Sequence, residues 1–481
     1  MKLTFWGAAR QVTGSMFLLE LDDDYRILID CGTEMARDRE EAHEMLVGSE
    51  INNGTSFPFD PSSINLVLLT HAHIDHSGNL PNLVRHGYEG QILCTAATHS
   101  LTQLLLLDSA SLHRRRLKSI HHSKRSNSRR ITQDTSQAAE MFLEQHVDET
   151  VERFVTIAFK HRFKIKSGVW ITFIPTGHLL GAANILLEIE ENGQLKKIGF
   201  SGDVGRRNYP LLPDPEPFPE VDYLLCESTY GNRRHKAQGT PEDILADVIK
   251  RTCIDIPGRL IIPAFSVGRT QALLYVLNKL YTERGFTPIR VFSDSPMALK
   301  STEIHQKFVK LLNKEAQEFN EEHDELFDFD NLHFVENMEQ SRHISSYHEP
   351  SIIISSSGMV NGGRVEDHIR KNIQNPYCTI LMVGFAAEGT LGHRLVHGQK
   401  TLRVGDKDVP IMANVEHTDV FSGHADLDDL LAFVKQQNPA KLKKLFVVHG
   451  EYETMLDYKA TLHELGYENV EIPKKGQTFL L

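Results

Sequence analysis

The sequence predicts an α/β protein in which a domain of short strands is interrupted by a second domain built on a parallel sheet. Roughly the first 200 residues combine short apolar runs with loops, as in FLLELDDDYRILID, where an acidic turn joins two strand-like runs. From Leu260 onward, apolar strands alternate with amphipathic helices, and this rhythm indicates a parallel sheet that is covered on both faces. A length of 481 residues exceeds what one ordinary core organises, which also favours two domains.

The second domain repeats a unit of strand, tight polar turn and helix. The repeats are LIIPAFSVGRTQALLYVLNKL, IRVFSDSPMALKSTEIHQKF, SIIISSSGMVNGGRVEDHIRK and TILMVGFAAEGTLGHRL. After Phe421 the chain forms one more strand, loop and helix in KLFVVHGEYETMLDYKATLHELG, and it closes with VEIPKKGQTFLL. We therefore expect the first domain over residues 1–231 and 421–481, and the inserted domain over residues 232–420.

Composition places the chain among ordinary globular proteins. Hydrophobic residues make up 40% and charged residues 24% of the sequence. No apolar run approaches the ~20 residues that a membrane helix needs, so we expect no membrane association. The N-terminus MKLTFWGAARQVTG lacks the basic start, apolar stretch and cleavage site of a secretory signal, and we expect a cytoplasmic protein.

The five cysteines do not indicate a disulfide framework or a thiolate metal site. Cys31, Cys94, Cys226, Cys253 and Cys378 lie far apart, form no CxxC pair and mostly follow apolar residues. We expect these cysteines to be small residues of the hydrophobic core.

A formal net charge of -12 argues against a protein that wraps nucleic acid through a bulk positive field. Any contact with RNA must then be local. One candidate is the segment 113–130, HRRRLKSIHHSKRSNSRR, which carries eight Lys or Arg and no acidic residue. A solvated loop between two helices and a surface that contacts RNA are both open interpretations of this segment.

The segment INLVLLTHAHIDHSGNLPNL carries the clearest chemical pattern. An apolar strand runs directly into His71, His73, Asp75 and His76. Side chains at alternating positions of a strand-end loop can converge, so the pattern predicts a metal site rather than a set of exposed histidines. Imidazole and carboxylate ligands without thiolate favour zinc or a similar divalent ion.

Further candidates stand at the ends of other strands. Asp30 ends YRILID, His178 follows VWITFIPTG, Asp203 follows KKIGFSG and His449 follows KLFVV. Each is weak evidence alone, because a strand-end Asp is usually a turn residue and a lone His is usually structural.

Together these segments resemble the metallo-β-lactamase superfamily, whose motifs match LID, THAHIDHSG, TGHLLGAAN, FSGDVG and VVHGE. The resemblance implies an αββα sandwich and two zinc ions. It implies that His71, His73 and His178 hold one ion, that Asp75, His76 and His449 hold the other, and that Asp203 bridges them. It also implies that Asp30 accepts ring N–H bonds from ligand histidines and fixes their tautomers.

The second domain narrows the resemblance to the branch that carries an inserted β-CASP domain, which includes ribonuclease J and the cleavage and polyadenylation endonuclease. The supporting segments are CESTYG, IPAFSVGRTQALL, SSSGMVNGGR, FSGHAD and VVHGE, and the similarity spans nearly the whole chain. A histidine at position 449 resembles the RNA-processing members, whereas the DNA-processing members usually carry valine. The resemblance therefore implies single-stranded RNA as the substrate.

The proposed hydrolysis needs a proton donor, because a ribose 3′-alkoxide is a poor leaving group near neutral pH. His424 in FSGHAD is suited to donate this proton, and Glu227 in CESTYG is suited to keep the imidazole protonated. We count both residues, together with the metal ligand Asp75, as candidate catalytic residues. An additional metal ligand and a plain helix-capping acid are the respective alternatives for His424 and Glu227.

Turns after two strands of the second domain are candidate phosphate sites. Ser266 and Arg269 follow IIPAF, and Ser357 and Gly358 follow IIISSS. We expect these turns to lie at helix N-termini, where free backbone N–H groups attract phosphates. Tight strand-to-helix connections would use the same residue types without binding anything, and that interpretation stays open.

The sequence thus predicts a zinc-dependent ribonuclease that leaves 5′-phosphate and 3′-hydroxyl ends. Rival functions are a metallohydrolase of another substrate class, namely DNA or a small thioester or lactone, and a non-catalytic RNA-binding subunit. The motifs do not separate internal cleavage from cleavage at a 5′ end. A homodimer is compatible with the sequence.

Overall fold

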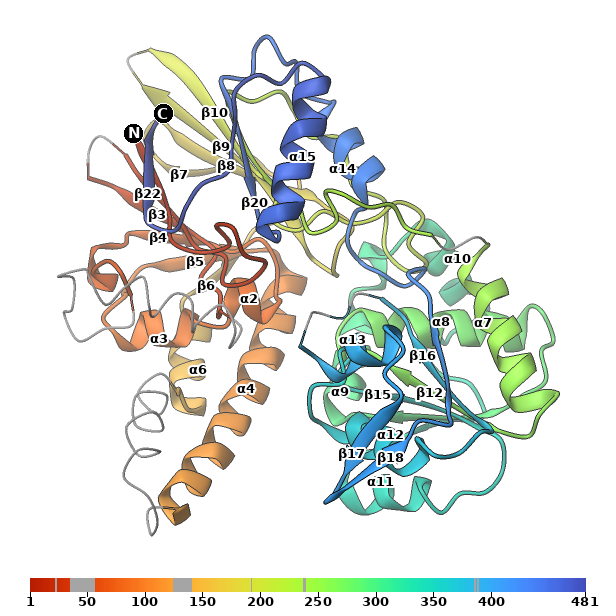
Figure 1. Cartoon of the computed structure of the whole chain (residues 1–481). Helices are drawn as coiled ribbons and strands as arrows, with labels where there is room; N and C mark the ends of the chain where they lie inside the picture. The colour runs from red at the N-terminus through yellow and green to blue at the C-terminus, as the bar shows by residue number, and fades with distance from the viewer. Residues whose placement is uncertain are drawn as a thin grey trace. The chain divides into compact units, whose positions relative to one another are not determined.

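The structure of the chain is a computed structural model that describes residues 1–21, 24–34, 57–123, 141–191, 193–236, 239–384, 386 and 389–481. The chain forms two compact units (Figure 1). Unit 1 comprises residues 1–205, 215–234 and 424–481, and unit 2 comprises residues 206–214 and 235–423. Unit 2 is therefore an insertion into unit 1.

Unit 1 contains two seven-stranded sheets. The first sheet has the order β22 (Gln477–Leu480), β1 (Lys2–Phe5), β2 (Phe17–Glu20), β3 (Arg26–Ile29), β4 (Leu66–Leu68), β5 (Gln91–Cys94) and β6 (Phe154–Thr156). The second has the order β21 (Val470–Glu471), β20 (Lys444–Val448), β11 (Tyr223–Glu227), β10 (Gln194–Phe200), β9 (Ala183–Glu191), β8 (Val169–Pro175) and β7 (Phe163–Lys166). In both sheets, antiparallel pairs at one side give way to parallel pairs at the other.

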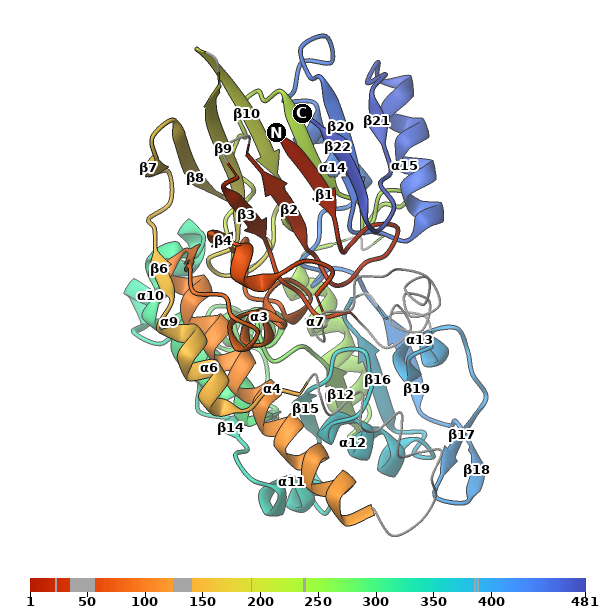
Figure 2. The ribbon, with the colours of Figure 1, turned by 90° about the vertical axis from the view of Figure 1, so that its left-hand side faces the viewer.

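The two sheets pack face to face. Apolar side chains at alternating strand positions, such as Leu3 and Phe5 from β1 and Ile171 and Phe173 from β8, form one buried core between them. In Figure 2 the red strands β1–β3 lie in front of the olive strands β8–β10. Each strand has one side that faces this core, because successive side chains of a strand point to opposite faces of the sheet.

Helices cover the outer faces of both sheets. On the first sheet, Leu80 and Leu83 of α3 (Leu80–Arg85) pack with Val67 and Ile92. On the second sheet, α14 (Leu427–Val434) and α15 (Tyr452–Glu464) pack against β11 and β20. The remaining helical segments of this unit are the 3₁₀ turn Pro61–Ser63, α2 (Ile74–Ser77), α4 (Ala96–Ser123) and α6 (Glu144–Val151). The layers confirm the predicted αββα sandwich.

Unit 2 is built on a six-stranded sheet in which every pair is parallel. Its order is β14 (Leu332–Phe334), β13 (Arg290–Asp294), β15 (Ser351–Ser355), β12 (Arg259–Pro263), β16 (Cys378–Met382) and β19 (Asn414–His417). Central strands such as Leu260–Ile262 are fully buried because helices lie on both faces. The predicted parallel-sheet domain is confirmed.

Helical segments connect these strands. They are α7 (Pro241–Ile249), the π-helical turn Lys250–Ile254, α8 (Arg269–Thr282), α9 (Pro296–Lys307), the 3₁₀ turn Val309–Leu311, α10 (Lys314–His323), α11 (Met338–Ile344), α12 (Arg364–Asn372) and α13 (Leu391–Val396). A two-stranded hairpin, β17 (Thr401–Val404) and β18 (Lys407–Pro410), completes the unit.

The burial of the cysteines agrees with the role expected for them. All five cysteines are buried and unpaired, as small core residues would be. Among the helices that the structure describes, none combines the length and apolar character that crossing a lipid bilayer requires.

Candidate metal centre

The loop after β4 presents the histidine-rich motif at one end of the sandwich. The buried strand β4 ends at Leu68, and the short helix α2 begins after His73, so the chain turns sharply between them. Gly32 of the neighbouring strand end lies against this turn, and a Cβ added there would stand 1.7 Å from the carbonyl oxygen of Asp75. Only glycine permits this approach, which brings Asp30 next to the motif.

Three further segments bring their side chains to the same place. His178 follows β8, Asp203 follows β10 and His449 follows β20. Both Asp30 and His449 have positive φ values, 57° and 52°, which non-glycine residues rarely adopt. Such backbone conformations cluster at functional sites, where the surrounding structure holds them.

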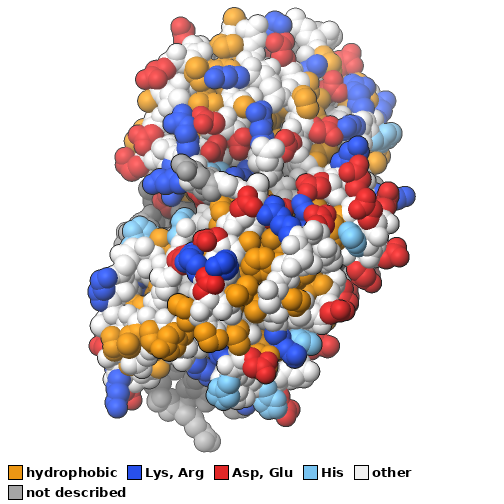
Figure 3. All heavy atoms as spheres, turned by 90° about the vertical axis from the view of Figure 1, so that its right-hand side faces the viewer, with side chains coloured by type: hydrophobic (Ala, Val, Ile, Leu, Met, Phe, Trp, Pro, Cys, Tyr) orange, Lys and Arg blue, Asp and Glu red, His pale blue; other side chains and the backbone are white. Residues whose placement is uncertain are grey.

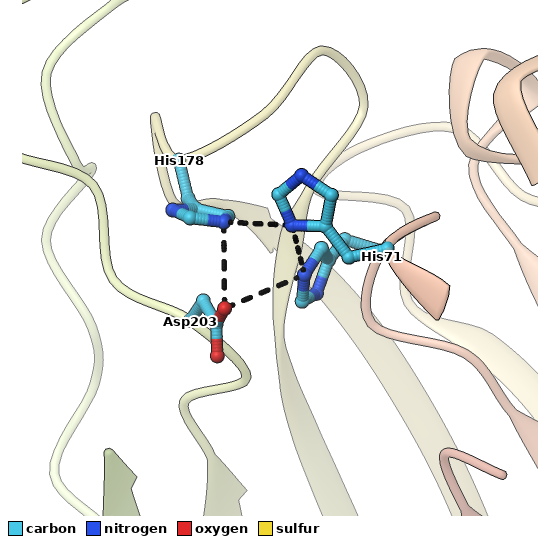
Figure 4. A group of neighbouring side chains, drawn as sticks. His71, His178 and Asp203 are labelled. Carbon is cyan, nitrogen blue, oxygen red and sulfur yellow. Dashed lines mark hydrogen bonds and ion pairs between the residues drawn. The ribbon is translucent and has the colours of Figure 1, made fainter. Parts of the chain in front are cut away.

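The first group consists of His71, His73, His178 and Asp203, and all four ligand atoms lie within 4.8 Å of one another. Nδ1 of His73 is 3.1 Å from Nε2 of His71 and 3.2 Å from Nε2 of His178. Oδ2 of Asp203 is 3.5 Å from His71 Nε2 and 3.4 Å from His178 Nε2. Figure 4 shows the side chains of His71, His178 and Asp203 pointing toward one another.

The second group consists of Asp75, His76 and His449. Nε2 of His449 lies 3.3 Å from Nε2 of His76 and 3.5 Å from Oδ2 of Asp75. All seven side chains that the sequence predicted as metal ligands therefore lie in these two groups.

Asp203 lies between the groups and turns one oxygen toward each. Its Oδ2 faces the first group, whereas its Oδ1 is 3.2 Å from His76 Nε2 and 3.6 Å from His449 Nδ1. The side chain is only 2% exposed, and its contacts among the described residues are to histidines of both groups. A buried carboxylate that is surrounded by imidazole nitrogens is a donor set that fits a divalent cation.

The spacing within the first group also fits zinc. Two ligand atoms on a tetrahedral zinc ion, each ~2.0–2.1 Å from the metal, stand about 3.3 Å apart. The distances of 3.1–3.5 Å between neighbouring nitrogen and oxygen atoms of the group match that edge.

The protonation states differ between the two groups. Burial lowers the pKa of His71 well below its usual value and that of His73 to about 4, so both rings keep a free lone pair near neutral pH. Burial alone would raise the pKa of Asp203, but His449 and His76 outweigh it and hold that pKa well below its usual value. Burial opposes a charge on His76 and His449, but Asp203 and the other nearby carboxylates outweigh it and raise the pKa of both rings, so a cation that binds the second group displaces protons from them.

Asp30 orders histidines of both groups. One carboxylate oxygen, Oδ2, lies 2.7 Å from His76 Nδ1 and accepts the hydroxyl of Thr70 at 2.9 Å. Oγ1 of Thr70 in turn lies 3.1 Å from Nδ1 of His71. These contacts direct the Nε2 atoms of His71 and His76 to the metal groups, because the Nδ1 atoms carry the ring protons. Sequence reasoning missed Thr70, although a hydroxyl directly before the first ligand histidine was a visible signal.

His424 and Glu227 form a pair beside the first group. Nδ1 of His424 lies 3.5 Å from Oε1 of Glu227 and 3.9 Å from Oδ2 of Asp203. Glu227 is fully buried and accepts the backbone N–H groups of Val204 at 2.6 Å and of Thr229 at 3.2 Å. Burial opposes a charge on His424, but Glu227 and Asp203 outweigh it and raise its pKa.

The four residues predicted to bind phosphate belong to unit 2. Ser266 and Arg269 are buried, and Arg269 is the first residue of α8. Its guanidinium lies 4.8 Å from the ring centroid of Phe265, and its Nη1 is 3.3 Å from the position that a Cβ on Gly358 would take. Arg269 and Gly358 therefore meet at the carboxyl end of the parallel sheet.

One part of that prediction was wrong. Ser357 and Gly358 do not lie at a helix N-terminus, because α12 begins only at Arg364. Gly362 and Gly363 have positive φ values of 82° and 78° and extend the turn before the helix starts.

The basic segment 113–130 is described only in part. Residues 113–118 lie on α4, where Arg114 pairs with Glu144, and residues 124–130 lie outside the described residues. The structure therefore does not decide between the two interpretations of this segment.

Three segments of the chain match known protein families. Residues 9–229 match the metallo-beta-lactamase superfamily, residues 270–395 match the Beta-Casp domain, and residues 408–473 match the Zn-dependent metallo-hydrolase RNA specificity domain.

The chain matches relatives over nearly its own full length. The chain is 30% identical over 478 residues to ribonuclease TTHA0252 of Thermus thermophilus, and the match covers 99% of both chains. It is also 30% identical over 473 residues to transcription termination factor FttA of Methanothermobacter thermautotrophicus, covering 96% of this chain and 69% of the relative. For FttA of Methanocaldococcus jannaschii the identity is 29% over 485 residues, covering 98% and 70%.

Proposed function

Because this chain belongs to the β-CASP branch of the metallo-β-lactamase superfamily, we propose that it is a two-zinc ribonuclease that hydrolyses single-stranded RNA in RNA processing or decay. The products in this proposal carry 5′-phosphate and 3′-hydroxyl ends. The observation that carries the proposal is the pair of ligand groups that share Asp203, with the His424–Glu227 pair beside them.

The ligand assignment follows the geometry. His71, His73 and His178 would hold one ion and Asp75, His76 and His449 the other, with Asp203 a candidate ligand of both. Divalent ions bound there would activate a water and neutralise charge on a phosphoryl group, which suits phosphodiester hydrolysis. Asp30 keeps the rings of His71 and His76 in the tautomer that this binding needs.

In this proposal two residues of the chain, His424 and Glu227, provide the proton that the leaving oxygen needs. His424 donates a proton to the 3′-oxygen as it leaves, and Glu227 keeps the imidazole charged until then. Two backbone N–H groups donate to the Glu227 carboxylate and hold it beside the ring. The side chain of His424 is 21% exposed, so it is open to a substrate, whereas Glu227 behind it is not.

Three observations support RNA as the substrate. Residues 408–473 match an RNA specificity domain, a relative over the full length is a ribonuclease, and position 449 is a histidine. Basic and acidic side chains lie interspersed on the face shown in Figure 3, which agrees with local rather than bulk attraction for RNA. In this proposal the insertion expected over residues 232–420 contacts the RNA backbone.

The rival functions predict different results. A metallohydrolase of DNA, a thioester or a lactone would cleave those substrates faster than RNA. A non-catalytic RNA-binding subunit would bind RNA without cleaving it, and the complete ligand set argues against this function.

The test uses single-stranded RNA labelled at its 3′ end, with either a free or a blocked 5′ end. We expect Asp75→Ala and His76→Ala to reduce cleavage by more than about 10³-fold while RNA binding persists, because each removes a metal ligand. His161→Ala is the matched control, since His161 is exposed and outside both groups. Full cleavage by Asp75→Ala would contradict the proposal, and the blocked RNA separates internal from 5′-end cleavage. Sedimentation velocity on the same samples tests a homodimer.

A further inference from the structure

Thr229 lies two residues after the end of β11 and contacts His449, the histidine of the second metal group that follows β20. Its side chain is buried. Oγ1 lies 3.1 Å from Nδ1 of His449 and donates to the carbonyl oxygen of the same residue at 3.4 Å. The hydroxyl thus meets both the ring and the backbone of His449.

The orientation of the His449 ring defines what this contact does. Nε2 faces the second group, 3.3 Å from His76 Nε2 and 3.5 Å from Asp75 Oδ2. If Nε2 offers its lone pair to an ion, Nδ1 must carry the ring proton, and that proton needs an acceptor. Thr229 Oγ1, at 3.1 Å, is nearer to Nδ1 than Asp203 Oδ1, at 3.6 Å, and is placed to accept this proton, while its own proton goes to the His449 carbonyl.

The backbone of Thr229 has a separate partner. Its N–H donates to Oε2 of Glu227 at 3.2 Å. Oε1 of the same carboxylate faces His424. One residue therefore contacts both the metal group and the pair that we propose for proton donation.

Neighbouring bonds hold the two strand ends together. The N–H of Ser228 donates to the His449 carbonyl at 3.2 Å, and the Ser228 hydroxyl donates to the Val448 carbonyl at 2.8 Å. The backbone at His449 is therefore fixed by several contacts. The orientation of its imidazole within that backbone is what the Thr229 hydroxyl adds.

We propose that Thr229 is a positioning residue of the second metal group, whose hydroxyl fixes the tautomer and the ring orientation of His449. This inference rests on the proposed function, because it takes His449 as a metal ligand. Thr70 occupies the equivalent place beside Nδ1 of His71 in the first group. Each group then has one histidine whose distal nitrogen is satisfied by a threonine hydroxyl.

The test compares Thr229→Val with Thr229→Ser in the full chain. Valine keeps the shape and the backbone N–H to Glu227 but removes the hydroxyl, whereas serine keeps the hydroxyl. Thr150→Val is the matched control, because Thr150 is also a buried threonine of unit 1, and its hydroxyl donates only to the carbonyl of His146. The measurement is a titration of metal-free protein with zinc against a competing chelator.

We expect the wild type to bind two ions and Thr229→Val to bind the second about 10–100-fold more weakly, the usual effect of losing an outer hydrogen bond to a ligand histidine. Thr229→Ser and Thr150→Val should bind both ions within a few-fold of the wild type. Excess zinc should restore RNA cleavage by Thr229→Val but not by Glu227→Gln.

Two outcomes would overturn the inference. Unchanged zinc affinity in Thr229→Val would remove the role of the hydroxyl and leave the two-metal proposal standing. Equal losses in Thr229→Ser and Thr229→Val would show that packing, not hydrogen bonding, matters at this position. A wild-type chain that binds a single ion would instead overturn the proposed metal centre, and this inference with it.

Discussion

The carboxylate of Glu227 lies 3.5 Å from the imidazole of His424, at the end of β11 and beside the first metal group. The carboxylate is fully buried and the ring is partly exposed. This order places the anion behind the proton donor that we propose, where it would act on His424 without meeting the substrate.

His424→Ala should slow RNA cleavage by about 10²–10⁴-fold, the range that a lost general acid produces. Glu227→Gln should give a smaller loss, because the imidazole remains but is less readily charged. The double variant should be no slower than His424→Ala, since the two residues act as one unit. Single-turnover cleavage rates of zinc-loaded protein measure these effects, and additive losses would contradict a shared role.

Asp30→Asn should lower zinc affinity by about 10–100-fold, because the carboxylate that orders His71 and His76 becomes a neutral amide. Zinc content after dialysis against a chelator gives the measurement. Asp60→Asn is the control, since Asp60 caps a 3₁₀ turn through the N–H of Ser62 outside both metal groups. Equal zinc retention in Asp30→Asn and wild type would remove the ordering role of Asp30.

Removing the metal should destabilise unit 1 in particular. An ion at a thousandfold excess over its dissociation constant stabilises the folded state by about 4 kcal/mol. Both tryptophans, Trp6 and Trp170, belong to unit 1, so their fluorescence reports on that unit during denaturation. We expect chelation to lower the urea midpoint of this signal, and His178→Ala to shrink the difference. A urea midpoint that is the same with and without zinc would show that the two groups bind no ion.

Unit 2 should lose stability in mild acid through His305. The ring is fully buried on α9, its Nδ1 donates to the Ser301 carbonyl at 2.8 Å, and Nε2 has no hydrogen-bond partner among the described residues. Burial lowers its pKa to about 4 from the usual 6.5, so between these values the unfolded chain binds a proton that the folded chain does not. The stability from neutral His305 is thus complete above pH 6.5 and falls as the pH drops toward 4.

The free energy of unfolding should fall by about 3 kcal/mol. The folded and unfolded pKa values differ by roughly 2.5, and a pKa difference of one corresponds to about 1.36 kcal/mol. Hydrogen exchange in α9 peptides at pH 7 and pH 4.5 measures it. His305→Phe should flatten this pH dependence, because the replacement has no group to protonate. An unchanged slope in that variant would assign the acid sensitivity to another group.

The ligand positions could be predicted because each follows an apolar strand and because the motifs together resemble the metallo-β-lactamase superfamily. That resemblance implied that Asp203 lies between the two groups, but which of its oxygens faces which group depends on the orientation of one side chain. Thr70 and Thr229 were missed for the same reason. Their role follows from which ring nitrogen faces them, and only the packed structure fixes that.

The fold was predicted where local pattern and global packing agree. The buried runs of β12 and β15 indicated a parallel sheet, and the short strand-like runs of the first 200 residues indicated a separate domain of strands. The helix start after β15 was misplaced, because a strand followed by Ser and Gly indicates a turn but does not give its length. The glycines at 362 and 363 extend that turn.

The pairing of β20 with β11 has a consequence for the order of synthesis. β11 is made before residues 235–423 of unit 2, whereas β20, which is followed by His449, is made after them. A nascent chain on the ribosome therefore lacks the second metal group until His449 has been made. The metal-dependent cleavage that we propose can begin only late in the synthesis of each chain.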